Sequence, residues 1–304
     1  MALVWASLPN RHVHPRALTR VVLQRKEGQM RLGGPLFEKY QNPEEWVRIV
    51  RASGYRAAYC PVGGDREDIQ AYASAAREAD IVIAEVGAWS NPLSPDEAVR
   101  KAAVEKCKKG LALAEEIGAR CCVNIAGSRG TKWDGPCRDD LTDGTFDMIV
   151  EVVRGILDDV RPQRSCYALE TMPWMYPDSV DAYLALIRAI DRKAFAVHCD
   201  PVNLICSPQR YFRNGEVIRD FIERLGPYIR SCHAKDILLQ DRLTVHLDEV
   251  QPGIGALDYR AYLTGLATLD RDIPLMLEHL PNAEAYEAAA THIRQVARNE
   301  RVSL

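Results

Sequence analysis

The sequence predicts an α/β protein with a single (β/α)8 barrel, also called a TIM barrel. Short apolar runs rich in β-branched residues and cysteine alternate with longer stretches whose apolar residues recur at helical spacing. The chain has 304 residues, 47% of them hydrophobic, which is enough to bury one core of this size. Strands that alternate with helices form parallel sheets, and eight such units fit this length as a closed barrel.

Eight runs are predicted strands. The weakest is 31–40, and the other seven are 55–62, 80–89, 119–127, 165–174, 195–203, 229–237 and 273–280. An open doubly wound sheet is the alternative, and such a sheet usually begins with a glycine-rich GxGxxG turn. The sequence RLGGP at 31–35 lacks that spacing, which favours the barrel.

Capping residues mark the helix starts. Asn42 precedes Pro43, and proline suits the first helical position, so a helix is expected to begin there. In SPDE, we expect Ser94 as the N-cap and Glu97 as the third helical residue of a capping box. Later helices are predicted over 178–190, 215–225, 257–269 and 283–298, with Asp258 near the cap of the third.

One domain is expected, over residues 30–304, because no composition shift or internal repeat divides this stretch. Residues 1–29, which include His12 and His14, are predicted to form an N-terminal arm. The start of the chain has no basic segment before an apolar run, and no later run reaches about 18 apolar residues. We therefore expect neither export nor a membrane span.

The cysteines and the charge balance restrict the class of protein. The nine cysteines are odd in number, follow no CxxC spacing and lie partly within apolar runs, which is typical of reduced core residues in a cytoplasmic protein. The net charge of -3 gives no basic stripe for nucleic acid. The expected partner is a small soluble molecule, and homo-oligomerisation is left open.

Ionisable residues lie toward the ends of the last four predicted strands. In such a barrel, catalytic groups stand at the carboxyl ends of the strands. The ionisable residues found there are Glu170, His198, Asp200, His233, Lys235 and Glu278. Ionisable groups are costly at the ends of apolar strands unless they are paired or bind a metal ion, so four such strands in succession indicate a site.

The alternation of side chains selects the residues that face the barrel interior. Residues two apart in a strand share a face, so His198 lies on the same face as Asp200, and His233 on the same face as Lys235. We predict that one divalent cation is held by Glu170, Asp200, His233 and Glu278. Three carboxylates and one imidazole favour Mn²⁺, Mg²⁺ or Co²⁺ over a thiolate zinc site.

Five motifs, in order, resemble the xylose isomerase-like TIM-barrel superfamily: ALETMPW, HCDPVN, HAKD, PGIGALDY and LEHL. That superfamily includes sugar isomerases and epimerases, dehydratases and the endonuclease IV type of DNA repair enzyme. The resemblance is best over 165–280, whereas 40–164 match mainly in β/α rhythm. It implies the same four metal ligands, acid and base roles for Glu170 and Glu278, and substrate binding by His198.

The chemistry of the residues supports that activity. A ketose is isomerised or epimerised when a proton next to its carbonyl is removed and returned to the other face or the next carbon. A divalent ion stabilises the enediolate, while Glu170 and Glu278 are expected to address opposite faces of the carbon. Lys235 and Trp174 are further candidates to bind substrate, and the loop 127–144 is a candidate lid.

Several alternatives remain open. A metal-dependent lyase or dehydratase begins with the same proton abstraction, a DNA repair endonuclease needs more than the seven histidines present, and a metal-free binding barrel predicts an incomplete ligand set. Lys235 and Asp236 can instead form a surface pair, and Asn203 is expected mainly to close a turn. Glu85 and Asn124 are candidates for the barrel interior without a predicted partner.

Overall fold

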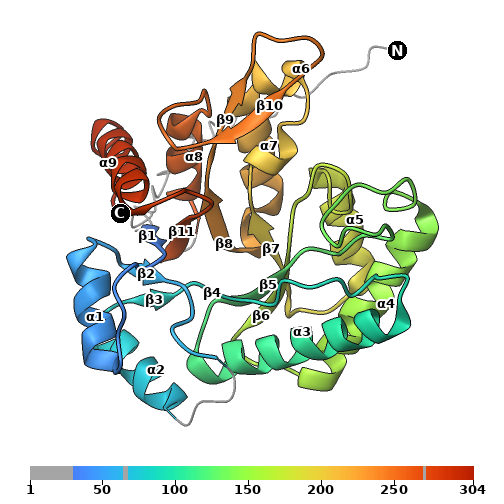
Figure 1. The fold of residues 1–304 in the computed structure, drawn as a ribbon, viewed down its shortest axis with the longest axis horizontal. Coiled ribbons are helices and arrows are strands. Elements are labelled where there is room, and N and C mark those ends of the chain that lie inside the picture. The colour runs from blue at the N-terminus through green and yellow to red at the C-terminus, as the bar shows by residue number, and fades with distance from the viewer. Residues whose placement is uncertain (1–29, 64–67, 270–271) are drawn as a thin grey trace, which may run out of the picture.

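The computed structural model describes residues 30–63, 68–269 and 272–304, and these form a nearly closed barrel surrounded by helices (Figure 1). Its nine parallel strands follow the order β3-β2-β1-β11-β8-β7-β6-β5-β4. The predicted arm at 1–29 lies outside the described residues, so the domain boundary at residue 30 stays a prediction. The predicted (β/α)8 fold is confirmed.

All eight predicted strands are present. They are β1 (Met30–Gly34), β2 (Ala57–Ala58), β3 (Val82–Ile83) with β4 (Glu85–Gly87), β5 (Cys121–Asn124), β6 (Cys166–Glu170), β7 (Phe195–Cys199), β8 (Ile229–Ala234) and β11 (Ile273–Leu277). Only Ala84 separates β3 from β4, yet β3 pairs with β2 and β4 pairs with β5. The first and last strands of the order, β3 and β4, are therefore parts of one stretch of chain, and this closes the sheet into a barrel. The alternative of an open sheet is excluded.

Helices cover the outside of the barrel. They are α1 (Pro43–Ala52), α2 (Ile69–Glu78), α3 (Glu97–Ile117), α4 (Asp143–Val160), α5 (Val180–Ile190), α6 (Pro208–Tyr211), α7 (Asn214–Leu225), α8 (Tyr259–Leu266) and α9 (Ala283–Asn299), with 3-10 turns η1 (Val202–Leu204) and η2 (Gly226–Tyr228). Asn42 caps α1 and Asp258 caps α8, each through its side-chain oxygen. These caps confirm two of the predicted helix starts.

The predicted capping box at Ser94 is wrong. The structure places Asp96 at the N-cap of α3, where its carboxylate accepts the backbone N–H of Val99. The Ser94 hydroxyl instead accepts the N–H of Asp96, two residues on. Ser94 thus forms a local turn before the helix, and the aspartate two residues later satisfies the free N–H groups of the first helical turn.

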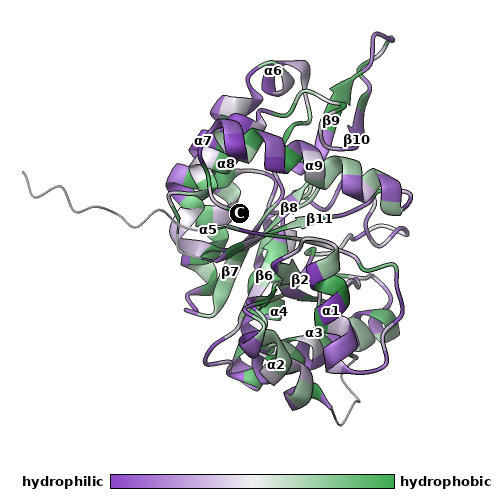
Figure 2. Ribbon diagram, turned by 90° about the vertical axis from the view of Figure 1, so that its left-hand side faces the viewer, coloured by the Kyte–Doolittle hydropathy of each residue, from purple (hydrophilic) through white to green (hydrophobic). Residues whose placement is uncertain are grey.

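The strand residues separate into two sets by direction. Outward-facing residues such as Leu169 and Val197 join the large core beneath the helices, whereas Ala168 and Ala196 belong to a separate small cluster that also contains Cys121 and Val123. Figure 2 shows the apolar strands inside a ring of helices with mixed surfaces. The period of two is thus confirmed, and small side chains fill part of the interior.

An antiparallel hairpin extends the chain beyond β8. It consists of β9 (Asp236–Leu239) and β10 (Leu247–Val250). The predicted strand 229–237 therefore covers β8 and the first residues of β9. In Figure 1 the hairpin stands apart from the barrel, above β8. It brings Glu249 toward the carboxyl end of the barrel, where Glu249 lies 3.5 Å from Lys235.

The cysteines and the helices bear on the expected class of protein. All nine cysteines are free, and five of them are buried, whereas Cys206 is exposed. Among the described residues, the structure has no helix that is both apolar enough and long enough to cross a bilayer. The cytoplasmic location stays a prediction.

Candidate metal centre

The four predicted ligands lie together at the carboxyl ends of β6, β7, β8 and β11. Each offers one ligand atom, and these atoms all lie within 4.8 Å of one another. The Nδ1 atom of His233 lies 3.3 Å from Glu170 Oε1, 3.7 Å from Asp200 Oδ2 and 2.8 Å from Glu278 Oε1. Asp200 and His233 are completely buried, and Glu170 nearly so. The structure thus gathers three carboxylates around one imidazole.

Lys235 enters the same cluster. Its Nζ atom lies 2.8 Å from Asp200 Oδ2, 2.5 Å from Glu278 Oε1 and 3.7 Å from Glu170 Oε1. Only 3% of the lysine is exposed. A buried ammonium group therefore occupies part of the space among the carboxylates, where it partly neutralises them.

The alternative that Lys235 and Asp236 form a surface pair is wrong. Both residues are buried, and they point to different surroundings. The Asp236 carboxylate accepts backbone N–H groups from its own strand and from the loop after β10, at residues Ile237, Gly253, Gly255 and Leu257. Asp236 therefore holds the PGIGALDY loop in place, which leaves Lys235 free to contact the carboxylate cluster.

Burial and neighbouring charges shift the ionisation of the cluster in opposite directions. Burial raises the pKa of the Glu170 carboxyl above its ordinary value. Burial also acts to raise the pKa of Asp200, but Lys235 and His233 outweigh it and hold that pKa well below the usual range. Burial lowers the pKa of the His233 imidazole, yet the carboxylates of Glu278 and Glu170 more than reverse this effect.

Asn203 contributes to the site as well as to the turn. Its Nδ2 atom donates to Glu170 Oε1 at 3.1 Å, to Asp200 Oδ2 at 3.3 Å and to the carbonyl of Thr171 at 3.0 Å. Asn203 lies in the turn η1, as the sequence predicts for a turn residue. The amide thus ties two candidate ligands from neighbouring strands to one another.

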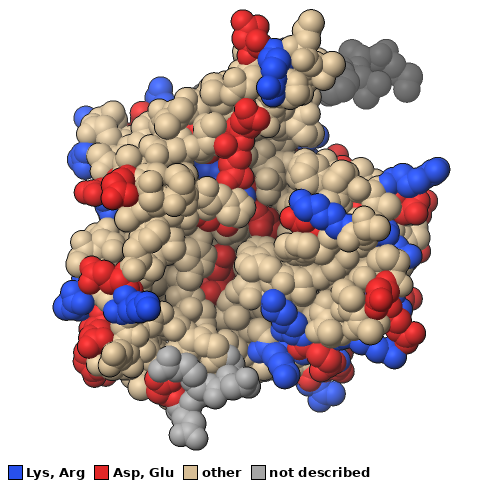
Figure 3. Space-filling view, viewed as in Figure 1, with Lys and Arg blue, Asp and Glu red and all other residues tan. Residues whose placement is uncertain are grey.

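The residues present fit a divalent cation. Hard ions such as Mg²⁺ and Mn²⁺ prefer oxygen ligands, and this cluster offers two buried carboxylates, the partly buried one of Glu278 and one imidazole. The carboxylates also outnumber the one fixed positive charge in the cluster, that of Lys235. In Figure 3, acidic side chains gather in a hollow near the middle of the face seen in Figure 1. Such an ion would be held by Glu170, Asp200, His233 and Glu278.

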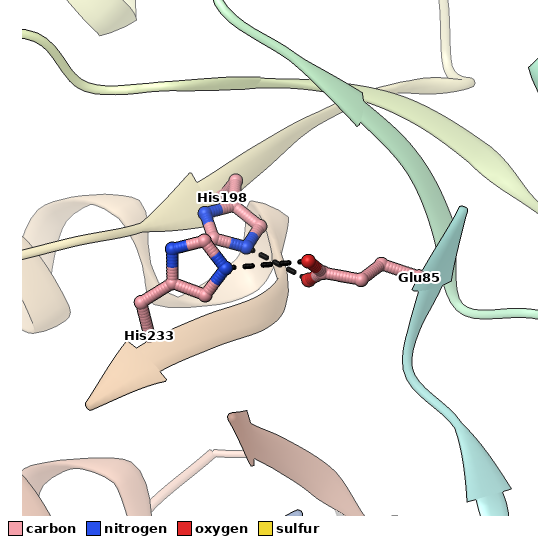
Figure 4. A group of neighbouring side chains, drawn as sticks. All are labelled: Glu85, His198 and His233. Atoms are coloured by element: carbon pink, nitrogen blue, oxygen red, sulfur yellow. Dashed lines mark hydrogen bonds and ion pairs between the residues drawn. The ribbon is translucent and has the colours of Figure 1, made fainter. Parts of the chain in front are cut away.

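A second group of polar side chains lies inside the barrel, beside the first. The Glu85 carboxylate lies 2.9 Å from His198 Nε2 and 3.2 Å from His233 Nε2 (Figure 4). It also accepts the Ser231 hydroxyl at 2.7 Å. Burial would raise the pKa of Glu85, but the two histidines outweigh burial and lower it. His233 therefore connects the two groups through its two ring nitrogens.

His198 is completely enclosed. Its ring packs against that of His233 with the centroids 4.1 Å apart, and none of its surface is exposed. Its Nδ1 atom is buried and has no hydrogen-bond partner within the described part of the chain. Substrate binding by His198 stays a prediction. The sequence could not predict the contact between His198 and Glu85, because the two residues are 113 positions apart in the chain.

The predicted rim residues lie at the surface. Trp174 is 37% exposed, and its Nε1 atom donates to the carbonyl of Asp134 in the candidate lid loop. That loop is anchored internally, because the buried Asp140 carboxylate accepts both the Ser128 hydroxyl and the backbone N–H of Arg129. The loop 127–144 thus packs against the segment that carries Trp174, and its role as a lid stays a prediction.

His279, the residue after Glu278, lies beside the cluster. Its side chain is 61% exposed, and its Nδ1 atom lies 3.0 Å from Glu249 Oε1 on the hairpin. A neighbour that the sequence analysis missed is Tyr59, which follows β2 and donates its hydroxyl to the carbonyl of Leu277 at 3.1 Å. Tyr59 and the hairpin thus flank the carboxyl end of β11, where Glu278 lies.

Solved structures of similar fold carry several different activities. One is an L-ribulose 3-epimerase (16% identity, 90% of this chain and 96% of that chain covered, TM-score 0.64). Another is a xylose isomerase-like TIM barrel protein from Mycobacterium smegmatis in complex with magnesium (14%, 90% and 97%, TM-score 0.61). A third is a probable 3-DHS dehydratase involved in petrobactin synthesis from Bacillus anthracis (16%, 86% and 95%, TM-score 0.63).

At these identities the structural likeness establishes the fold alone. A search of curated protein sequences gives no match. The sequence profile of the family described as the xylose isomerase-like TIM barrel matches residues 47–296, which is most of the chain and includes all four candidate ligands. The chain therefore belongs to the xylose isomerase-like TIM barrel family.

Proposed function

We propose that the protein is a divalent-metal-dependent isomerase or epimerase that acts on a ketose or keto-sugar. The observation that carries this proposal is the convergence of three carboxylates, two of them buried and that of Glu278 partly buried, with His233 at the carboxyl end of the barrel. The similar L-ribulose 3-epimerase and the magnesium complex of a family member support it. The partner is accordingly a small sugar molecule.

Glu170 and Glu278 are the proposed acid and base. Glu170 ends β6 and Glu278 follows β11. These strands are separated in the sheet by β7 and β8, so the two carboxylates approach the centre from different directions. When bound, a divalent ion would supply Lewis-acid stabilisation of negative charge on a carbonyl oxygen. One carboxylate would then remove the proton next to the carbonyl, and the other would return a proton to the opposite face or the next carbon.

The proposed substrate contacts differ in their support. Lys235 has an ammonium group at the cluster itself, and Trp174 has an exposed ring at the rim. His198 has the least support of the three, because its ring is completely buried and its Nε2 atom already contacts Glu85. Substitution of Lys235 should therefore weaken binding of a sugar more than substitution of His198.

A metal-dependent lyase or dehydratase is the second candidate. The similar probable dehydratase favours it, because elimination begins with the same abstraction of a proton next to a carbonyl. The two candidates differ in whether the substrate carries a leaving group β to that carbonyl. Product analysis after exposure to ketoses and to keto-glycosides separates them, since only elimination yields an unsaturated product and a released group.

Metal analysis of the purified protein tests the proposal. We expect about one Mn²⁺, Mg²⁺ or Co²⁺ per chain, and weakened or lost binding in Glu170→Gln and Asp200→Ala. Glu115→Gln is the matched control, because Glu115 caps the 163–165 turn and should leave metal binding unchanged. Wild-type protein that binds no divalent ion even after supplementation would refute the mechanism.

A second measurement tests the proton transfer. Incubation with candidate ketoses in deuterium oxide should place solvent deuterium next to the carbonyl of a converted sugar, and Glu170→Gln should lower the rate of incorporation. A converted sugar without any incorporation would argue against an exchangeable enediolate. Glu115→Gln again serves as the folded control.

A further inference from the structure

Glu85 reaches into the barrel interior toward the opposite wall. It lies on β4, at one end of the strand order, whereas the two histidines that it contacts lie on β7 and β8 (Figure 4). Ala168 on β6 and Ala196 on β7 belong to the small interior cluster, and their short side chains leave room for the longer glutamate. The buried carboxylate is thus surrounded by strands from across the barrel, with 2% of its residue surface exposed.

The hydrogen-bonding capacity of Glu85 defines which ring nitrogens carry protons. An ionised carboxylate only accepts hydrogen bonds, so each ring nitrogen that it contacts must be an N–H donor. Its Oε2 atom contacts His198 Nε2 and accepts the Ser231 hydroxyl, and its Oε1 atom contacts His233 Nε2. Both imidazoles therefore carry a proton on Nε2.

We propose that Glu85 is a positioning residue that fixes His233 in the orientation required of a metal ligand. With Nε2–H committed to Glu85, the other nitrogen of His233 faces Glu170, Asp200 and Glu278. Partners of this kind orient a ligating histidine and set its tautomer. The role of the oriented nitrogen rests on the proposed function, whereas the protonation pattern at Nε2 does not.

The same three residues could instead hold an ion of their own, since ligand atoms of Glu85, His198 and His233 also lie within 4.8 Å of one another. A neutral imidazole has a single nitrogen lone pair, so His233 cannot ligate one ion through Nδ1 and another through Nε2. The Ser231 hydroxyl, which donates to Glu85, also fits an acceptor carboxylate in a hydrogen-bonded group. The geometry therefore favours one ion per chain.

Nitrogen-15 NMR of histidine-labelled full-length protein, with and without diamagnetic Mg²⁺, tests the protonation pattern. In the wild type we expect Nε2 of both His198 and His233 to be protonated, and Nδ1 of His233 to lose its proton when Mg²⁺ binds. In Glu85→Gln, the amide NH2 faces a ring N–H that formerly had an acceptor, so at least one ring should change its tautomer. Glu115→Gln should retain the wild-type spectrum.

Mn²⁺ affinity, measured from the electron paramagnetic resonance signal of the free ion, tests the consequence. Glu85→Gln should weaken Mn²⁺ binding by about 10-fold to 100-fold. Ser231→Ala keeps the carboxylate and both histidine contacts, so it should weaken binding less than Glu85→Gln. It also provides a folded comparison if Glu85→Gln is unstable.

Three outcomes would overturn the inference. They are an unprotonated Nε2 on His233 in the Mg²⁺-bound wild type, unchanged spectra and Mn²⁺ affinity in Glu85→Gln, or two tightly bound ions per chain. Failure of the proposed function is a different result: the wild type would bind no divalent ion, while the Nε2 protons of the two histidines would still report whether Glu85 holds both rings.

Discussion

Charged side chains cluster at both ends of the barrel, but the balance of charge differs between the two clusters. At the amino end, Arg31 on β1 donates to Asp272 Oδ1 at 2.6 Å and to the carboxylate of Asp80 at 3.0 Å and 3.1 Å, and Arg56 also contacts Asp80. The Arg120 guanidinium also donates to the backbone carbonyl of Asp272 at 3.2 Å. Carboxylates are thus not in excess at this end, and the cluster needs no added cation.

At the carboxyl end, carboxylates are in excess. Lys235 contacts four of them, at Glu170, Asp200, Glu249 and Glu278. Two imidazoles also reach these carboxylates: that of His233, which must give up a proton to ligate an ion, and that of His279, which lies 3.0 Å from Glu249 and 3.7 Å from Glu278. The comparison teaches that a cluster without excess negative charge needs no added cation, whereas an excess of buried carboxylates indicates where a cation belongs.

The largest expected effect is on catalysis. Glu278→Gln removes a proposed acid or base and should lower the rate of solvent-deuterium incorporation by about 10²-fold to 10⁴-fold, since general acid–base catalysis contributes that much. The measurement uses whichever ketose the wild-type protein converts, with Arg31→Met as the control at the other end of the barrel. A rate within a few-fold of the wild type would remove Glu278 from the proposed mechanism.

The second effect is on stability, and it tests whether the carboxyl-end cluster binds a cation or is only a set of ion pairs. Lys235→Met should lower the unfolding free energy of the metal-free protein by about 3 kcal/mol, because it leaves buried carboxylates without their partner. Saturating Mn²⁺ should recover much of this loss, because an ion that binds only the folded state stabilises it. Urea unfolding with and without Mn²⁺ measures both values. Without recovery, the carboxyl-end cluster would resemble the one at the amino end.

A smaller effect is expected at the amino end. Arg31→Met should lower the unfolding free energy by about 1 kcal/mol, because the side chains of its partners Asp80 and Asp272 are 62% and 34% exposed and remain partly solvated. Mn²⁺ affinity should stay at the wild-type value. Weakened Mn²⁺ binding in this variant would mean that the two clusters are coupled through the barrel.

The smallest expected effect is on how the unfolding free energy depends on pH. Arg31 holds the pKa of the Asp80 carboxyl below its ordinary value of 3.8. A carboxyl whose pKa is lowered by folding stabilises the protein above its unfolded pKa and loses that contribution as the pH falls toward its folded pKa. The difference in unfolding free energy between the wild type and Arg31→Met should therefore shrink as the pH falls below about 4. Urea titrations at pH 7 and at about pH 3 check this, and an unchanged difference would contradict it.

The strands and the four clustered residues were predictable because each depends on a local pattern. Apolar runs defined the strands, and alternation along each run assigned Glu170 and Asp200 to the interior. The parallel arrangement then required that neighbouring strand ends meet at one edge. The capping error at Ser94 arose because Asp96, two residues later, is an equally suitable cap, and sequence alone does not rank two such neighbours.

Other features depended on contacts between distant segments. The division of 80–89 into β3 and β4 follows from barrel closure, since this one stretch must pair with β2 on one side and β5 on the other. The role of Asp236 likewise depends on the loop at 253–257, whose N–H groups reach its carboxylate. No pattern within either segment reveals its partner.

The sequence by itself determined the barrel, its family and the residues that meet at the carboxyl end, because hydrophobic period, strand order and side-chain alternation are local properties of the chain. Only the tertiary structure decided that Lys235 lies among the carboxylates and that Glu85 joins His198 to His233. Both depend on distances across the barrel interior, which closure of the sheet sets and which no spacing along the chain encodes.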